Sequence, residues 1–199
     1  MRHWSRRVCS AVVLTLTCVS GAVRAAEPPT APAVLDYWPM QPGMTWIYQD
    51  DRGHRQVVHV VGRQQLDGES VTVVEQTLSG AVLLRFYYVV RDGHVMRVAS
   101  ERVGGPAPSA LQRYTPPIIV WSTQLESDIQ RQETIAVPAG TYQCLVVAHR
   151  ASTGDTQTIW MAPGVGKVRS TVTGADGQQV SSVELMDFVS SSAMGAAAP

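Results

Sequence analysis

Short β-forming runs separated by turn dipeptides are the feature that most constrains the fold of this chain. Asp67-Gly68 and Asp92-Gly93 each stand between two such runs. Asp-Gly is among the strongest short-range signals for a β-hairpin. The body of the chain shows no convincing helical period of apolar residues. The pattern therefore predicts an all-β domain built from consecutive antiparallel hairpins.

Two later turns combine proline with glycine. In Val137-Pro138-Ala139-Gly140, proline fixes the first central φ of a type I turn. Gly140 can then take the left-handed position that closes a three-residue hairpin loop. In Ala162-Pro163-Gly164-Val165, Pro followed by Gly predicts a type II turn, because the second central residue needs φ > 0. Neither turn carries a nucleophile, a base or a metal ligand, so these signals predict architecture and leave activity open.

The runs between the turns predict a single, strongly curved antiparallel sheet, a meander that is half-barrel to barrel-like. Residues 100–117 are the longest irregular piece, with Gly104-Gly105-Pro106 and Pro116-Pro117, and we interpret them as a mobile or functional loop. Residues 118–121 form either a short strand or the apolar edge of that loop. The predicted strands are residues 45–49, 56–64, 71–78, 82–91, 94–99, 129–137, 141–150, 156–161, 167–173 and 179–189.

Residues 82–91 give the clearest assignment of sheet faces, because alternate residues of a strand point to opposite sides. One alternating set is wholly apolar or aromatic, and we predict that it faces the interior. The other set mixes apolar residues with Arg85 and Arg91, as expected for a partly wetted outer surface. The predicted inward set is Val82, Leu84, Phe86, Tyr88 and Val90.

The first 25 residues read as a secretory signal peptide. Three arginines precede an apolar run at residues 8–23, and Val23-Arg24-Ala25 offers small residues for cleavage after Ala25. The run is shorter than the ~20 residues that a spanning helix needs, so we expect no transmembrane anchor. Ser5-Arg6-Arg7 leaves twin-arginine export open beside the general route. Neither Cys9 nor Cys18 follows a small residue, so we do not expect a lipoprotein.

These features predict a periplasmic or secreted protein with four parts. Residues 1–25 form the signal peptide, 26–36 a flexible leader, 37–189 a single β-rich domain, and 190–199 a disordered tail. Without residues 1–25 the chain keeps 12 basic and 16 acidic residues, a formal net charge of −4. A mildly acidic body without a basic run argues against a nucleic-acid partner.

Several motifs resemble those of a broad family of exported bacterial domains of unknown function. The shared pattern joins Trp46-Ile47-Tyr48, VPAGTYQC at residues 137–144, WMAPGVGKV at residues 160–168 and a final strand containing Glu184-Leu185. The resemblance covers residues 37–189. The chain departs from the pattern at Met161, where an aromatic residue is usual, and at Lys167, where an apolar residue is usual. The family resembles the curved half-barrel of LolA-type lipoprotein carriers, which implies an apolar ligand.

Residues that could carry chemistry do not form a convincing catalytic or metal site. Cys144 is the only cysteine after residue 25, and His149, five positions along the same strand, points to the opposite face. We therefore expect Cys144 to pack as a small buried hydrophobe. Asp50, Asp51 and His54 could gather at a hairpin tip, but they read as solvated turn residues. We expect no catalytic residue, no metal and no cofactor.

Aromatic residues on the predicted strands favour a binding function. A curved sheet brings some of them together, and they then either fill the core or line a pocket for a hydrophobic ligand beneath the loop at residues 100–117. We predict a non-catalytic, exported domain that binds an apolar small molecule or lipid. The alternatives are a protein-interaction module of the cell envelope and an enzyme. The candidate ligand-binding residues are Trp46, Tyr48, Phe86, Tyr88, Trp121 and Trp160.

Overall fold

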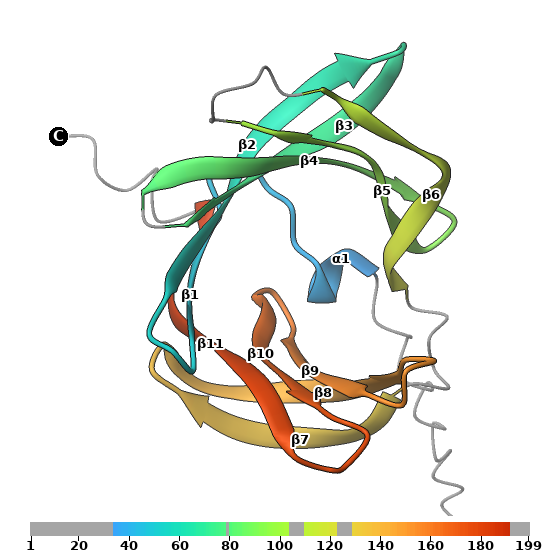
Figure 1. The fold of residues 1–199 in the computed structure, drawn as a ribbon. Coiled ribbons are helices and arrows are strands. Elements are labelled where there is room, and N and C mark those ends of the chain that lie inside the picture. The colour runs from blue at the N-terminus through green and yellow to red at the C-terminus, as the bar shows by residue number, and fades with distance from the viewer. Residues whose placement is uncertain (1–33, 79, 104–109, 123–128, 192–199) are drawn as a thin grey trace, which may run out of the picture. The chain divides into compact units, whose positions relative to one another are not determined.

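A computed structural model describes residues 34–78, 80–103, 110–122 and 129–191. These residues contain one short helix and eleven strands (Figure 1). The helix α1 is Val34–Tyr37, and the strands are β1 Thr45–Asp50, β2 Arg55–Leu66, β3 Glu69–Leu78, β4 Ala81–Arg91, β5 His94–Arg102, β6 Gln112–Ser122, β7 Ile129–Val137, β8 Gly140–Arg150, β9 Thr156–Ala162, β10 Gly166–Thr173 and β11 Gln179–Val189.

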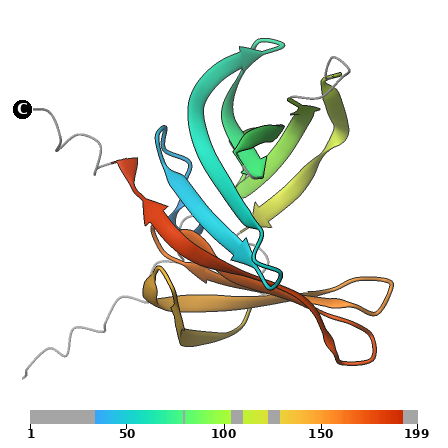
Figure 2. The ribbon, with the colours of Figure 1, turned by 60° about the vertical axis from the view of Figure 1, so that its left-hand side comes forward.

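All eleven strands belong to one sheet with the order β6-β5-β4-β3-β2-β1-β11-β10-β9-β8-β7. Every pair is antiparallel and joins sequence neighbours, except that β1 pairs with β11, while the sequence neighbours β6 and β7 lie at opposite edges. The sheet is thus two meanders, β2–β6 and β7–β11, joined through β1, with β6 and β7 as its edges. Figures 1 and 2 show the sheet curling so that the two meanders face each other, with α1 between them. The structure confirms the predicted fold class, an all-β single curved antiparallel sheet.

The ten predicted strands are all present, with ends displaced by no more than three residues. The interpretation of residues 100–117 as one irregular loop is wrong at both ends, because β5 continues to Arg102 and β6 begins at Gln112. Pro116 and Pro117 lie within β6, which is possible because an edge strand has one side without ladder hydrogen bonds. Residues 104–109, the centre of the predicted loop, lie outside the described residues. No helix in the described ranges is long and apolar enough to cross a membrane.

Both proline-glycine turns form. Gly164 has φ +72°, and the Val165 N–H donates to the Ala162 carbonyl at 3.2 Å, as a turn with glycine at its second central position requires. Gly140 has φ +140°, but it already pairs with Val137 as the first residue of β8. The loop between β7 and β8 therefore has two residues rather than the predicted three.

Apolar side chains are buried on both faces of the sheet. The larger cluster includes the inward residues of β1–β4 and also Val146 and Trp160 of β8 and β9. A smaller cluster covers the outer face of β3–β5, where Tyr87 and Val89 are 4% and 5% exposed. The prediction of a partly wetted outer face is therefore wrong at these two residues. Phe86 and Tyr88 point inward as predicted, but Val90 is 42% exposed. The alternation of β4 is kept from Phe86 to Val89, and the register shift in the β4–β5 pairing leaves the extra residue, Val98, on β5.

Candidate ligand-binding site

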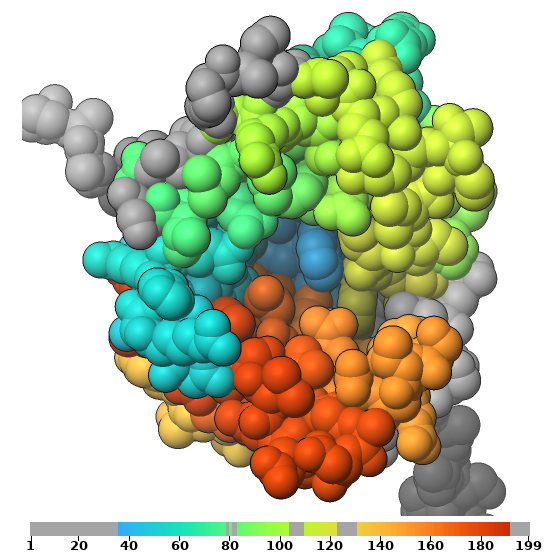
Figure 3. Space-filling view, in the orientation of Figure 1, coloured from blue at the N-terminus to red at the C-terminus, as the bar shows by residue number. Residues whose placement is uncertain are grey.

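An apolar pocket of about 190 Å³ opens on the inner face of the sheet. Its walls come from β1–β4, from the segment after α1 and from the start of β10. Figure 3 shows a hollow between the two meanders, with blue atoms of the N-terminal described part visible inside it. Four of the predicted ligand-binding residues line the pocket: Trp46, Tyr48, Phe86 and Tyr88. The other lining residues are Trp38, Pro39, Met40, Gln56, Val58, Val60, Val74, Gln76, Gly166 and Lys167.

Hydrogen bonds tie the two aromatic residues of β1 to the turn between β9 and β10. The Trp46 Nε1–H donates to the Val165 carbonyl at 2.5 Å, and the Tyr48 hydroxyl donates to the Lys167 carbonyl at 2.9 Å. Each bond joins residues 119 positions apart. Two motifs that the sequence shows separately, Trp46-Ile47-Tyr48 and the Pro-Gly turn, therefore form one wall of the pocket.

The segment around α1 fixes the same turn from the other side. The Gly164 N–H donates to the Asp36 carbonyl at 2.6 Å. Gly166 has φ +92°, and a Cβ built on it would lie 3.6 Å from Pro39 Cδ and 3.7 Å from the Tyr37 carbonyl oxygen. Glycine thus supplies the left-handed backbone that lets the turn lie against this segment.

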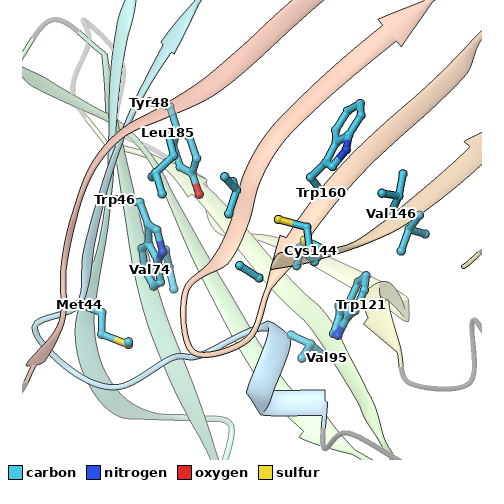
Figure 4. Packing of buried hydrophobic residues seen from close by; sticks show 14 of the residues in the cluster. Met44, Trp46, Tyr48, Val74, Val95, Trp121, Cys144, Val146, Trp160 and Leu185 are labelled. Carbon is cyan, nitrogen blue, oxygen red and sulfur yellow. The ribbon is translucent and has the colours of Figure 1, made fainter. Parts of the chain in front are cut away.

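The other two predicted ligand-binding residues, Trp121 and Trp160, lie elsewhere and do not line the pocket. Trp121 stacks on Trp38 at a centroid distance of 6.5 Å, and the Trp160 Nε1–H donates to a Glu133 carboxylate oxygen at 3.3 Å. Figure 4 shows them on the side of the view that also holds Cys144, away from Trp46 and Tyr48. We call this region, defined by Trp121, Cys144, Val146 and Trp160, the filled side. Trp38 separates the two regions, because it lines the pocket and stacks on Trp121.

Cys144 is part of the filled side, as predicted for a packed core thiol. It is 1% exposed, and its nearest polar partner is the Tyr142 carbonyl at 3.7 Å. Burial raises the pKa of the thiol to about 11, Glu133 adds to the rise, and Arg169 opposes it. A thiol that keeps its proton at neutral pH is a poor nucleophile.

Lys167 is the pocket residue that sequence reasoning missed as a site residue. It is the only lysine of the chain, and its ammonium lies 4.6 Å from the centroid of the Tyr48 ring. Its side chain is half-buried toward the pocket, and the surrounding protein desolvates the charge and lowers its pKa. The signal was available, since Lys167 stands where the resembled family has an apolar residue.

The hairpin tip at Asp50 is a polar turn beside this pocket. One Asp50 carboxylate oxygen accepts from the backbone N–H groups of Arg52 and His54, and the other lies 2.9 Å from His54 Nδ1. The hydrogen bond from His54 lowers the pKa of the Asp50 carboxyl. Asp51 accepts from the backbone of Ser182 instead. Within the described ranges, no group of three or more His, Cys, Asp or Glu residues could hold a metal ion.

The comparisons with known proteins extend only to the fold. No protein-family model matches the chain, and no curated protein matches it. A candidate exported protein of Bacteroides fragilis with a YmcC-like fold superposes with a TM-score of 0.50 at 14% identity, covering 76% of this chain and 98% of its own. A candidate lipoprotein of Parabacteroides distasonis superposes with a TM-score of 0.45 at 14% identity, covering 76% of this chain and 97% of its own. The chain therefore has a fold similar to the YmcC-like fold of the first.

Proposed function

We propose that this protein is a non-catalytic binding domain of the bacterial cell envelope, whose inner pocket takes an apolar molecule. The observation that carries the proposal is the aromatic pocket itself. Trp46, Tyr48, Phe86 and Tyr88 converge on about 190 Å³ of space that the described residues do not fill. Concave, mostly apolar sites with a few polar groups are the usual form of small-molecule binding sites. Six aromatic candidates were predicted, and four gather here.

An envelope location rests on the sequence of residues 1–25 and not on the described structure. The charged start, the apolar run and the small residues around Ala25 fit a cleaved export signal. The Bacteroides fragilis protein of similar fold is itself a candidate exported protein, which is in keeping with this location. The resemblance to exported domains and to LolA-type carriers supports an apolar or lipid-like ligand in the same compartment.

A neutral apolar dye tests the proposal. N-phenyl-1-naphthylamine, added to purified and delipidated protein, should bind saturably at one site and quench tryptophan emission, because Trp38 and Trp46 line the pocket. Val58→Phe, which places a larger side chain in the pocket, should weaken dye binding about tenfold or more. Val61→Phe is the matched control on the same strand, since Val61 is 49% exposed and does not line the pocket. Equal dye binding by both variants, or no saturable binding, would contradict the proposal.

A protein-interaction role is the second candidate, and one observation favours it. Edge strand β6 exposes Ile118 and Ile119, which are 38% and 52% exposed. An exposed apolar edge strand can pair with a strand of another chain. Ile119→Lys should then abolish any association that sedimentation detects in the wild-type protein. A wild-type protein that sediments as a monomer up to high concentration, alone and with envelope extract, would remove this candidate.

A further inference from the structure

We propose that the pocket selects a small apolar carboxylate, and that the Lys167 ammonium holds the carboxylate while the aromatic wall holds the apolar body. This inference rests on the proposed binding function and names the ligand class for the same pocket. Lys167 is the only charged residue among the pocket-lining residues. The polar side chains beside it are Gln56, Gln76 and the Tyr48 hydroxyl, which already donates to a backbone carbonyl.

The ammonium has no carboxylate partner among the described residues. Every ion pair found there involves Arg or His, and the glutamates next to this part of the sheet are engaged on the outside. Glu75 and Glu101, for example, both pair with Arg85. The one close partner of Lys167 is the face of the Tyr48 ring. A desolvated charge without a counterion is unfavourable, so an anion that enters the pocket gains a favourable partner.

A second cation strengthens the preference for an anion. The Arg97 guanidinium lies 5.1 Å from the centroid of Phe86, a pocket residue, and 5.2 Å from that of Tyr114. Its Nε–H is buried and has no hydrogen-bond partner within the described residues. Two cations therefore contact the aromatic wall, and no carboxylate lines it. The pocket accordingly carries a positive potential in an apolar surrounding, which favours an amphiphilic anion over a neutral ligand of the same shape.

The volume limits the size of the ligand. A dry cavity of about 150 Å³ is enough for benzene, whereas drug-sized ligands occupy about 300–1,000 Å³. At about 190 Å³ the pocket alone suits a short aliphatic tail or a single ring, and a larger ligand such as N-phenyl-1-naphthylamine has to extend into the adjoining cavity. A second cavity of about 200 Å³ shares Tyr48, Gln56 and Gln76 with it and gives a longer tail a continuation. Asp50 lines that second cavity, and its carboxylate would repel the carboxylate of the ligand. The ligand carboxylate therefore belongs at Lys167, and the tail extends from Lys167 toward the second cavity.

Calorimetry with octanoate and 1-octanol at neutral pH tests the inference on the full mature chain. The wild-type protein should bind octanoate about tenfold more tightly than octanol, the gain expected from one charge-assisted contact. In Lys167→Met the ratio of the two affinities should fall to about one. Arg63→Met removes an exposed cation from β2, outside the pocket, and should keep the ratio near ten.

A direct readout is also available because the chain has a single lysine. In protein labelled with ¹³C at lysine Cε, octanoate should shift the one lysine signal and octanol should not. Octanol binding without a preference for octanoate would overturn the carboxylate inference and leave the apolar pocket standing. A preference that survives in Lys167→Met would also overturn it. Binding of neither ligand would remove both the inference and the proposed function.

Discussion

The pocket and the filled side belong to one curled sheet, yet only one of them is packed. Trp160 pairs with Arg169, Arg169 with Glu184, and Glu184 with Gln49, so Trp160 lies on the sheet face opposite to Tyr48. On the filled side, Cys144 and Val146 are at most 1% exposed, and the tryptophans lie against neighbouring side chains and Glu133. On the pocket side, Trp46 and Tyr48 are also buried, at 6% and 4% exposure, but about 190 Å³ stays open beside them. Burial of large aromatic residues alone therefore does not close a curled sheet.

The difference follows from how the aromatic residues are held. Trp46 and Tyr48 each donate a hydrogen bond to the β9–β10 turn, which α1 fixes through Gly164. Moving either ring into the open space would break a partly buried hydrogen bond, at a cost of about 1–3 kcal/mol. Trp121 has no such tether within the described residues, and its ring stacks on Trp38. Trp160 on the filled side is also hydrogen-bonded, to Glu133, so a hydrogen bond alone does not keep a cavity open. The pocket differs because its two hydrogen-bonded rings, both on β1, are held at the start of β10 and the turn before it.

The largest expected contrast comes from the same substitution made in each region. Val146→Ala removes methyl groups from a fully buried side chain of the filled side and should lower the free energy of unfolding by about 2–3 kcal/mol. Val58→Ala shortens a partly buried side chain that lines the pocket, and should cost less than about 1 kcal/mol. Urea denaturation of both variants measures the difference. Similar losses would mean that the two regions are packed alike.

The same substitution in each of the two glycine turns should distinguish an effect on stability from an effect on ligand binding. Gly140→Val and Gly164→Val should each cost about 1–3 kcal/mol, because a β-branched residue tolerates positive φ poorly. Only the turn at Gly164 carries Val165 and Lys167, whose carbonyls accept from the pocket aromatics. Gly164→Val should therefore also weaken dye binding, measured at a temperature where both variants are folded. If Gly140→Val weakened binding as much, the pocket would depend on the filled side.

The thiol reports on packing of the filled side. Because the pKa of Cys144 is raised to about 11 and the residue is 1% exposed, native protein should react slowly with a thiol reagent at pH 8 and quickly in denaturant. Cys144→Ser should lower stability by about 1–2 kcal/mol, because it buries a more polar group, and should leave dye binding unchanged. Rapid labelling of the native state would show that this side opens.

Lys167 should give the smallest effect on stability, with the opposite sign. Lys167→Met removes a desolvated charge and should be neutral or stabilising, by up to about 1 kcal/mol. The folded-state pKa of Lys167 lies below the ordinary 10.5, so between these two values the unfolded chain binds more protons. Wild-type stability should therefore gain from this group as pH rises through its folded pKa, and lose that gain as pH falls.

The matched control for this pH dependence is Lys167→Met itself, which should lack the gain. Tyr48, the titratable group that faces Lys167 among the described residues, keeps its proton in this range because burial raises its pKa. Unfolding measured between pH 7 and pH 10 for both proteins gives the difference. A stability difference between the two proteins that stays constant over this pH range, or that changes in the opposite direction, would contradict the inference that the Lys167 ammonium is desolvated.

Local signals in the sequence predicted the fold well. Turn residues such as Asp92-Gly93 and Pro163-Gly164 act on their own hairpins, so each predicted strand pair could be found without knowledge of the rest. The alternation of β4 was predicted correctly from Phe86 to Val89, but the burial of its outer face was not, because that burial depends on the separate apolar cluster over β3–β5. Residues 118–121 were predicted as a possible short strand, but the first part of β6 was missed because its prolines indicate a loop unless the strand is known to lie at an edge.

The candidate site could be predicted only in part, for a related reason. Aromatic residue type identifies side chains able to line a pocket, and four of the six do so. Which of the six line the pocket depends on hydrogen bonds between residues 119 positions apart, and local sequence patterns do not contain such contacts. Trp121 and Trp160 are tryptophans on predicted or possible strands, as Trp46 is. Only their contacts in the structure, with Trp38 and Glu133, distinguish them from Trp46. The sequence shows Lys167 at a position where the resembled family has an apolar residue, but only the structure shows that Lys167 lines the pocket.

Xenon tests the contrast between the two regions most directly, because xenon enters dry apolar cavities. Crystals of the delipidated protein, pressurised with xenon, should show the gas among Trp46, Phe86 and Tyr88 and none around Cys144 and Trp160. Val58→Phe crystals should show less xenon in the pocket, and Val61→Phe crystals should match the wild type. Xenon absent from the pocket, or bound equally on both sides, would contradict the account of one sheet with an open region and a filled one.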